Sequence, residues 1–322
     1  MITGIGAFAP EKVLSNFDLE KRVDTSDEWI RTRTGIERRH NLESGLPNSD
    51  MAANASRRAL EAASVKAEEL DCIITATITP DSLLPSTACR VQAKIGAEQA
   101  AAMDVAGACS GFLYAMTLAD AMIHRGRYRK ILVIGSEVLS RFTNWEDRKS
   151  CVLFGDGSGA VVMTPSDGHA GMLSAYIKSD GRLGDLLAIP GGGSTFPASH
   201  DTVDQKLHTI HMQGQEVFKH AVRTMVDAAQ HGLKEAGYAS KDIDLLITHQ
   251  ANMRIIQAVG KRLKLPDEKI FTNLSEYGNT SSASIPLALE QAQREGRLKK
   301  GNLCLLVAFG GGFTWASTLV RW

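Results

Sequence analysis

The chain repeats itself at long range, and this internal duplication restricts the folds that it can adopt. The segment AASVKAEELDCIITAT resembles EAGYASKDIDLLITHQ, which aligns Asp71 with Asp244 at an offset of 173 residues. A second pair, HRGRYRKILVIGSE and REGRLKKGNLCLLVAFGGG, aligns Gly126 with Gly296 at an offset of 170. Because the two offsets nearly agree, we interpret the chain as two copies of one structural unit.

Each copy contains the same ordered parts: a helical stretch, an apolar strand, a glycine-containing turn into a second helix, a basic turn and a further apolar strand. Helices that alternate with apolar strands are typical of α/β architecture with partly buried sheets. The turn-rich stretch TPSDGHAG, residues 164–171, is the expected boundary between the copies. We therefore predict two α/β halves, residues 1–166 and 167–322, packed about a pseudo-twofold axis.

Cys109 lies where the glycine-containing turn DVAGA opens an apolar helix in the first copy. Asn279, in EYGNTSSAS, follows 170 residues later, so the second offset predicts that both residues occupy the same position in their copies. A cysteine in the first turn of a helix is close to the positive end of the helix dipole, which can lower the thiol pKa from about 8.5 toward neutral. We expect Cys109 to be a nucleophile, although most cysteines are buried structural thiols.

His249 follows the apolar strand LLIT, at the position where the first copy has Ala76. Ligand sites in α/β sheets gather at the carboxyl ends of strands and at helix N-termini. The alternative is that both residues have structural roles. Asparagine readily caps helices and occupies left-handed turns, and a lone histidine is usually structural. The repeat positions favour a functional role for both His249 and Asn279.

A Cys, His and Asn set supports two reaction types. In a cysteine hydrolase the His activates the thiol and the Asn orients the His, but that role gives no reason for the duplication. In a condensing enzyme the thiolate accepts an acyl group, while neutral His and the Asn amide donate hydrogen bonds to a malonyl thioester and stabilise the enolate that remains after loss of CO2. We favour condensation, and a non-catalytic acyl-CoA-binding protein is the third alternative.

The segment AFGGGFTW, residues 308–315, ends an apolar strand with three consecutive glycines. Glycines let the backbone approach a reacting centre closely and supply N–H donors to an oxyanion. The bulk composition restricts the partners, because 36 Lys and Arg balance 36 Asp and Glu. We therefore expect no nucleic-acid or membrane partner, a cytoplasmic location, and reduced thiols in all five cysteines.

Six motifs make the chain resemble the β-ketoacyl-ACP synthase III family, the initiating condensing enzymes of type II fatty acid synthesis, from Ile2 to Trp322: TSDEWIRTRTGIERRH, GACSGF, FGDGSGA, HQANMRII, YGNTSSAS and AFGGGFTW. The resemblance implies a thiolase-like fold layered α-β-α-β-α, a homodimer, and no metal or cofactor, with the CoA thioester entering as substrate. It also implies a catalytic triad of Cys109, His249 and Asn279, and an oxyanion hole formed by the N–H groups of Cys109 and Gly311.

The same resemblance implies the binding sites for both substrates. The CoA tunnel falls on aromatic, amide and guanidinium side chains that suit adenine and phosphates, namely Trp29, Arg33, Arg148, Phe218, Asn252 and Arg254. The acyl pocket falls on Leu84, reached across the dimer interface, and on Phe309. Malonyl-ACP is the expected second substrate, and because the net charge is zero the acidic carrier requires a local basic patch, for which the candidates are Lys219, Arg254, Lys261 and Arg262.

Two positions depart from the family pattern. Lys149 follows Arg148 where the family has Gly, which affects the adenine side of the tunnel. Leu84 stands where some acetyl-preferring members have Phe, so acetyl and longer or branched primers both stay open. A specialised relative that uses the same triad on another acyl group is the alternative enzyme.

Overall fold

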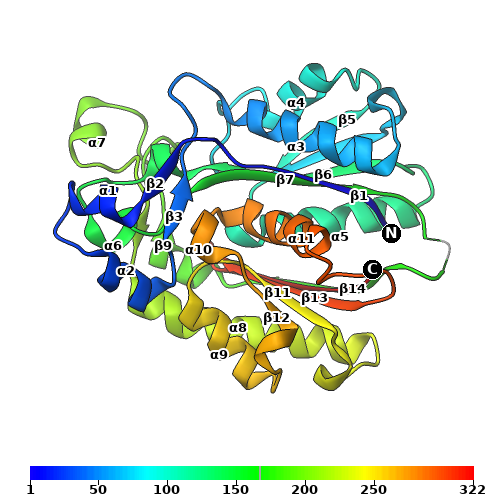
Figure 1. The fold of residues 1–322 in the computed structure, drawn as a ribbon. Helices are drawn as coiled ribbons and strands as arrows, with labels where there is room; N and C mark the ends of the chain where they lie inside the picture. The colour runs from blue at the N-terminus through cyan, green and yellow to red at the C-terminus, as the bar shows by residue number, and fades with distance from the viewer. Residues whose placement is uncertain (167) are drawn as a thin grey trace.

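The computed structural model describes residues 1–166 and 168–322 of the chain. Within them the longer strands form two five-stranded sheets, one above the other (Figure 1). The first sheet has the order β1 (Ile2–Phe8), β7 (Asp156–Met163), β6 (Ile131–Val138), β4 (Cys72–Ala76) and β5 (Ala101–Val105). The second has the order β8 (Gly171–Ser179), β14 (Thr314–Arg321), β13 (Leu303–Gly310), β11 (Leu245–Thr248) and β12 (Ile270–Phe271).

The two sheets have one topology. In the first, β4 lies parallel to β5 and β6, and β7 and β1 continue the sheet antiparallel. In the second, β11 lies parallel to β12 and β13, and β14 and β8 continue it antiparallel. The same chain order in both sheets confirms the duplication inferred from the sequence.

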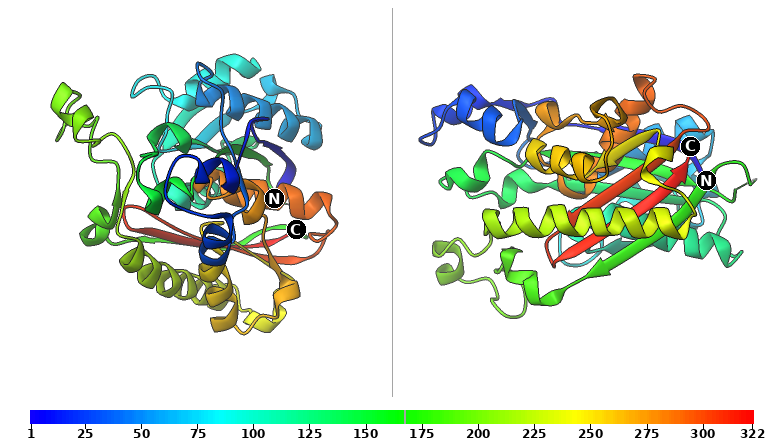
Figure 2. Two further views of the ribbon diagram at one scale, coloured as in Figure 1. Left: turned by 60° about the vertical axis from the view of Figure 1, so that its left-hand side comes forward. Right: turned by 90° about the horizontal axis from the view of Figure 1, so that it is seen from below.

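Six helices and the two sheets make five layers, as expected (Figure 1). The outer face of the first sheet packs against α3 (Asn48–Ala63) and α4 (Thr87–Ile95). The outer face of the second packs against α8 (Gly214–Glu235) and α9 (Met253–Arg262), and α8 lies along its strands when seen from below (Figure 2). Between the sheets lie α5 (Gly111–His124) and α11 (Ser284–Arg294).

The strands are apolar on both faces because each sheet is covered on both sides. Successive residues point to opposite faces, so Ile73 packs under α3 and α4 while Ile74 packs in the central layer. In the second sheet, Leu305 packs toward α8 and α9, and Leu306 packs in the central layer. This alternation explains why ILVIGSEV and LCLLVAFG read as nearly continuous apolar runs.

Shorter elements gather mainly at the end of the sheets away from the chain termini (Figure 1). They carry several of the side chains that the family resemblance assigns to binding. Their bounds are β2 (Val13–Ser15), α1 (Asn16–Glu20), α2 (Asp27–Thr34), β3 (Arg38–His40), α6 (Arg148–Cys151), β9 (Leu187–Ala188), α7 (His200–Asp204), β10 (His211–Met212) and α10 (Leu274–Tyr277).

The repeated aspartates make the same contact in both halves. The carboxylate of Asp71 accepts the N–H of Lys130 at 2.9 Å, and the carboxylate of Asp244 accepts the N–H of Leu303 at 2.8 Å. Each aspartate lies just before the first parallel strand of its sheet, β4 or β11, and receives a donor at the start of the neighbouring parallel strand, β6 or β13. The offset of 173 is therefore a structural equivalence, and it also places His249 opposite Ala76.

The expected equivalence of Cys109 and Asn279 is wrong. The short turns η2 (Ala108–Ser110) and η7 (Ser281–Ala283) open α5 and α11, and the first residue of each turn has a positive φ, 46° and 49°. These turns match at the offset of 173, which places Cys109 opposite Ser282. Helix α11 has 11 residues where α5 has 14, so the offset falls to 170 only at the far ends of the helices.

Each of these turns packs against the central strand of the other half. A Cβ atom added to Gly135 in β6 would lie 2.3 Å from the carbonyl oxygen of Ser282 in η7. A Cβ atom added to Gly310 in β13 would lie 2.6 Å from the backbone nitrogen of Cys109 in η2. Only glycine permits backbone to approach backbone this closely, so the two glycines set how the halves meet.

The predicted boundary lies between the two sheets. Strand β7 ends at Met163 and β8 begins at Gly171, and residue 167, where the second half was predicted to begin, lies outside the described residues. In the part of the chain that the structure describes, no helix is both long and apolar enough to cross a membrane, and no group of three His, Cys, Asp or Glu side chains could hold a metal ion.

Replacing Gly135 with Ala should destabilise the protein. The new methyl group would contact the backbone of Ser282, which cannot move without shifting η7, so we expect a loss of about 2 kcal/mol or more in the free energy of unfolding. Urea denaturation measures this loss. Gly181→Ala is the matched control, since its Cβ would meet nothing within 4 Å; equal stabilities of the two variants would contradict the packing role of Gly135.

Candidate functional site

A cavity of about 340 Å³ opens at Cys109 where the two halves meet. Its walls come from both halves and are mostly apolar, with one hydroxyl and one thiol. They are Ile78, Ala106, Ala108, Cys109, Leu139, Phe154, Leu187, Ala188, Ile189, Ile210, Ser281 and Gly311. An apolar pocket of this size suits a short acyl chain better than a charged ligand.

Cys109 is held in the strained turn η2 and is only 7% exposed. The expectation of a lowered thiol pKa is wrong: burial raises the pKa of Cys109 to about 12, and the negative charge of Glu137 adds to the rise. A hydrogen bond with the hydroxyl of Ser281 acts in the opposite direction. Burial is thus the largest influence on this thiol, and it favours the neutral form.

His249 is fully buried just beyond the end of β11. Its Nδ1 atom lies 2.7 Å from the hydroxyl of Ser284, and that hydroxyl also accepts the N–H of Gln250 at 3.3 Å. The Ser284 proton can therefore be donated to Nδ1, which places the ring proton on Nε2, an atom with no hydrogen-bond partner within the described residues. Burial lowers the pKa of His249 to about 3, so the ring is neutral at physiological pH.

Asn279 is held by its backbone and by its side-chain oxygen. Its N–H donates to the carbonyl oxygen of Leu153 at 2.9 Å, and its carbonyl oxygen accepts the N–H of Gly155 at 3.0 Å. Its Oδ1 accepts the N–H of Ser281 at 2.9 Å. This bond fixes the orientation of the amide and leaves the Nδ2 group as the donor available to a ligand.

The glycine-rich segment supplies one wall of the cavity, through Gly311. Gly310 packs against the backbone of Cys109, as described above, which brings the N–H side of η2 and the glycine segment together. Phe309 does not line this cavity. Its ring lies edge-on to the imidazole of His249, with centroids 5.5 Å apart, and excludes water from one side of that histidine.

The residues expected to bind CoA come from four elements. On α2, the ring of Trp29 lies 4.9 Å from the guanidinium carbon of Arg33 and 5.0 Å from that of Arg148, which belongs to α6. At the start of α9, the side chain of Asn252 donates to the carbonyl oxygen of Arg33 at 3.1 Å, which ties α9 to α2. Phe218 lies on α8 and is exposed.

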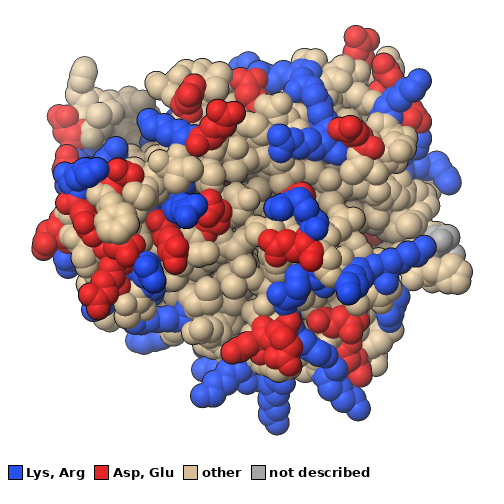
Figure 3. Space-filling view, in the orientation of Figure 1, with Lys and Arg blue, Asp and Glu red and all other residues tan. Residues whose placement is uncertain are grey.

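The expected basic patch is spread over two helices. Arg254 lies in the first turn of α9 and donates to the carbonyl oxygen of Thr32 at 3.2 Å, whereas Lys261 and Arg262 lie in the last turn of the same helix. Lys219, on α8, is exposed and pairs with Glu216 at 2.6 Å. Basic side chains protrude along the lower edge of the molecule, the region of α9, among acidic ones (Figure 3).

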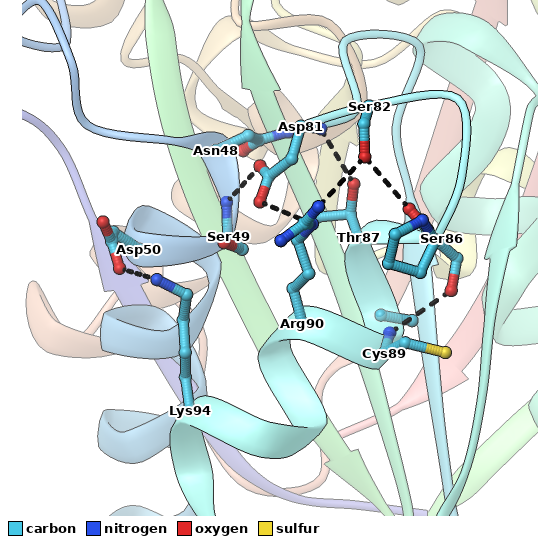
Figure 4. A network of polar contacts seen from close by, with 12 residues as sticks. Asn48, Ser49, Asp50, Asp81, Ser82, Ser86, Thr87, Cys89, Arg90 and Lys94 are labelled. Carbon is cyan, nitrogen blue, oxygen red and sulfur yellow. Dashed lines mark hydrogen bonds and ion pairs between the residues drawn. The ribbon is translucent and has the colours of Figure 1, made fainter.

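Leu84 lies in the loop between β4 and α4. Polar contacts of Asp81 and Ser82 anchor this loop (Figure 4). At the base of the loop, the carboxylate of Asp81 accepts the N–H of Ser49 at 2.9 Å and pairs with Arg90 at 3.7 Å. Leu83 and Leu84 are nevertheless 87% and 85% exposed. A braced loop that presents two adjacent leucines to water is suited to a protein contact.

Sequence reasoning missed three residues of this site. Ser284 holds His249, Ser281 holds Asn279, and Glu137 is a fully buried carboxylate beside η7. The signal for Glu137 was present, since it is the one charged residue in the apolar strand ILVIGSEV. The two serines carry no such signal, because TSSAS reads equally well as the start of a helix.

Comparisons with known proteins agree over the whole chain. Residues 103–181 match the family description 3-oxoacyl-[acyl-carrier-protein (ACP)] synthase III, and residues 233–322 match its C-terminal counterpart. The β-ketoacyl-[acyl-carrier-protein] synthase III of Caldanaerobacter subterraneus subsp. tengcongensis is 54% identical, with 100% of this chain and 97% of the relative covered. The enzyme of that name from Clostridioides difficile is 50% identical, with 100% and 98% covered. The crystal structure of 3-oxoacyl-[acyl-carrier-protein] synthase III from Aquifex aeolicus VF5 has a TM-score of 0.93 and 46% identity, with 100% and 99% covered.

The neutral His249 should make the protein less stable in acid. An unfolded chain binds a proton at this histidine below about pH 6.5, whereas the folded protein excludes it down to about pH 3, so stability falls as the pH drops between these values. From pH 7 to pH 5 the wild type should lose on the order of 2 kcal/mol more than His249→Gln. Urea denaturation at both pH values measures the difference, and parallel losses would contradict a buried neutral ring.

Proposed function

This chain belongs to the β-ketoacyl-[acyl-carrier-protein] synthase III family, and we propose that it condenses an acyl-CoA primer with malonyl-ACP. The products are a β-ketoacyl-ACP, CO2 and CoA, and the reaction initiates fatty acid biosynthesis. The observation that supports this proposal is that one segment, Ser281 to Ser284, contacts all three groups. Ser281 contacts the Cys109 thiol and holds the Asn279 amide, and Ser284 holds the neutral His249 ring.

In the first half-reaction, the thiolate of Cys109 attacks the carbonyl carbon of the acyl-CoA. The oxyanion that forms accepts hydrogen bonds from the N–H groups of Cys109 and Gly311, and its collapse releases CoA as the leaving thiolate, which takes up a proton. The acyl chain then occupies the apolar cavity beside Cys109. The close approach of Gly310 to the Cys109 backbone supports this geometry, because no side chain blocks the N–H side of the turn.

In the second half-reaction, the thioester oxygen of malonyl-ACP accepts hydrogen bonds from His249 Nε2 and Asn279 Nδ2. Loss of CO2 leaves an enolate whose charge these two donors stabilise, and its carbon attacks the acyl group on Cys109. Departure of the Cys109 thiolate completes the β-ketoacyl-ACP. A histidine with a pKa of about 3 donates without losing its proton, which suits this role better than that of a general base.

For CoA, we propose that the adenine ring stacks between the indole of Trp29 and the guanidinium groups of Arg33 and Arg148. In this structure both guanidinium groups lie against that indole. Phe218, Asn252 and Arg254 would line the rest of the passage. The CoA thioester enters as a substrate, and no cofactor takes part. Lys149, where the family has Gly, adds a third positive charge next to the adenine end.

The exposed pair Leu83 and Leu84 supports a homodimer in which Leu84 reaches the acyl pocket of the other subunit. Phe309 would then contribute to the pocket only indirectly, by holding His249. The enzyme would act in the cytoplasm, with residues 1–166 supplying the acylated thiol and residues 167–322 supplying the donors. A panel of straight and branched acyl-CoAs separates an initiating synthase from a specialised relative that uses another acyl group.

The division of roles predicts distinct defects in three variants. Cys109→Ala should form no acyl adduct with acyl-CoA, whereas His249→Ala and Asn279→Ala should still be acylated but should release CO2 from malonyl-ACP at least about 100-fold more slowly. Intact mass and CO2 release measure the two steps. Cys89→Ala, which removes an exposed thiol, should keep the adduct. Normal CO2 release in His249→Ala or in Asn279→Ala would contradict the assignment. Release of free acid from acyl-CoA in the absence of malonyl-ACP would indicate a hydrolase.

A basic patch for the carrier predicts a selective charge effect. Lys261→Glu and Arg262→Glu should each raise KM for malonyl-ACP about tenfold at low salt, because the acidic carrier meets a reversed charge, and should leave acylation by acyl-CoA unchanged. Steady-state kinetics with each substrate varied in turn measures this. Lys300→Glu is the control, since it reverses an exposed charge in the turn before β13. Equal KM values for all three variants would contradict the patch.

A further inference from the structure

Glu137 is a fully buried carboxylate at the end of β6, and the triad does not account for it. The N–H of Ile78 donates to it at 3.1 Å, and that of Thr79 at 3.2 Å. The hydroxyl of Thr79 donates at 2.6 Å and that of Thr77 at 3.1 Å. Both hydroxyls also accept N–H groups, from Val138 and from Thr79, so their protons point at Glu137. Burial raises the pKa of Glu137, and these donors act against that rise by stabilising the carboxylate.

The remaining donors come from the other half of the molecule. The hydroxyls of Ser281 and Ser282, in η7, lie 3.1 and 3.0 Å from Glu137 Oε1, and the Ser282 hydroxyl also lies 2.9 Å from the carbonyl oxygen of Ala76, which competes for its one proton. The N–H of the same Ser281 holds Oδ1 of Asn279. Glu137 therefore ties the turn that orients the Asn279 amide to the loop that follows β4 in the first half.

Glu137 also acts on the nucleophile. The Ser281 hydroxyl can donate its one proton either to Glu137 or to the Cys109 sulfur, and only the second favours a thiolate. The negative charge of Glu137 opposes formation of a thiolate. The other buried ionisable groups nearby face elsewhere: the Asp156 carboxylate in β7 binds the N–H and hydroxyl of Ser140, and the neutral His249 binds Ser284. The charge next to Cys109 is thus supplied by a single residue among those that the structure describes.

We propose that Glu137 is a positioning residue for both steps of the reaction: it holds η7, and with it Asn279, in place, and it sets a negative charge beside the Cys109 thiol. The expected effect of Glu137 on malonyl decarboxylation rests on the proposed function. The expected effect of Glu137 on ionisation of the Cys109 thiol does not depend on that function. Removing the charge should make Cys109 easier to ionise while making malonyl decarboxylation slower. Exposure of a loosened junction to water would also ease ionisation of the thiol, so the test needs a variant, Glu137→Asp, that disturbs the same contacts but keeps the charge.

The experiment compares Glu137→Gln with Glu137→Asp in the full-length protein. Iodoacetamide alkylation of Cys109 against pH should shift to lower pH in E137Q, with a rate about tenfold higher at pH 8, because a like charge has been removed. It should stay near the wild-type profile in E137D, which keeps the charge. CO2 release from malonyl-ACP should fall about 10- to 100-fold in E137Q and less in E137D, since the shorter side chain still reaches part of its donors.

Two further variants keep the test decisive. Asp156→Asn removes another fully buried carboxylate from the neighbouring strand and should leave the alkylation profile unchanged. Ser281→Ala removes the hydroxyl that links η7 to Glu137 but keeps the N–H that holds Asn279, and it should slow CO2 release from malonyl-ACP, so it tests the positioning role even when E137Q does not fold. An E137Q alkylation profile identical to the wild type, or unchanged CO2 release in S281A, overturns the proposal. A wild-type protein that forms no acyl adduct overturns the proposed function instead, and the alkylation comparison still decides the role of Glu137.

Discussion

The close contact of two short turns across the junction of the halves is the constraint on which the site depends. Turn η2 carries Cys109 and packs on β13 at Gly310, while η7 follows Asn279 and packs on β6 at Gly135. Each half thus supplies a turn to the other half's central strand. Both turns begin with a non-glycine residue at positive φ, a conformation that is unfavourable for the isolated backbone. The packed layers on both sides of the junction stabilise this arrangement.

Removal of water affects the three central groups differently. It keeps His249 neutral and therefore a donor, but it opposes ionisation of the Cys109 thiol, and Glu137 strengthens that opposition. Asn279 carries no charge, so burial affects only its hydrogen bonds, and the Ser281 N–H satisfies its oxygen. A dry junction suits stabilisation of an enolate by hydrogen bonds, since water would otherwise compete for the same oxygen.

Much of the fold could be predicted from the sequence because duplication and apolar strands are local patterns. Asp71 and Asp244 aligned correctly, and with them Ala76 and His249, because neither copy has an insertion between the aspartate and the end of the strand. The pairing of Cys109 with Asn279 was wrong because the offset of 170 was measured beyond the ends of α5 and α11. Helix α11 is three residues shorter than α5, so this offset does not apply at the starts of the helices. The direction of the thiol pKa was also wrong, since burial by the second half is a tertiary effect that no local motif reports.

The central claim is that one half presents an acylated thiol and the other presents two neutral donors to the same thioester oxygen. A crystal structure of the acylated enzyme with a non-decarboxylating malonyl thioester analogue tests it most directly. The account predicts that the analogue's thioester oxygen lies about 2.7 to 3.2 Å from both His249 Nε2 and Asn279 Nδ2, with the acyl group on Cys109 in the apolar cavity. A thioester oxygen bound away from these two atoms, or an acyl group on another residue, would contradict it.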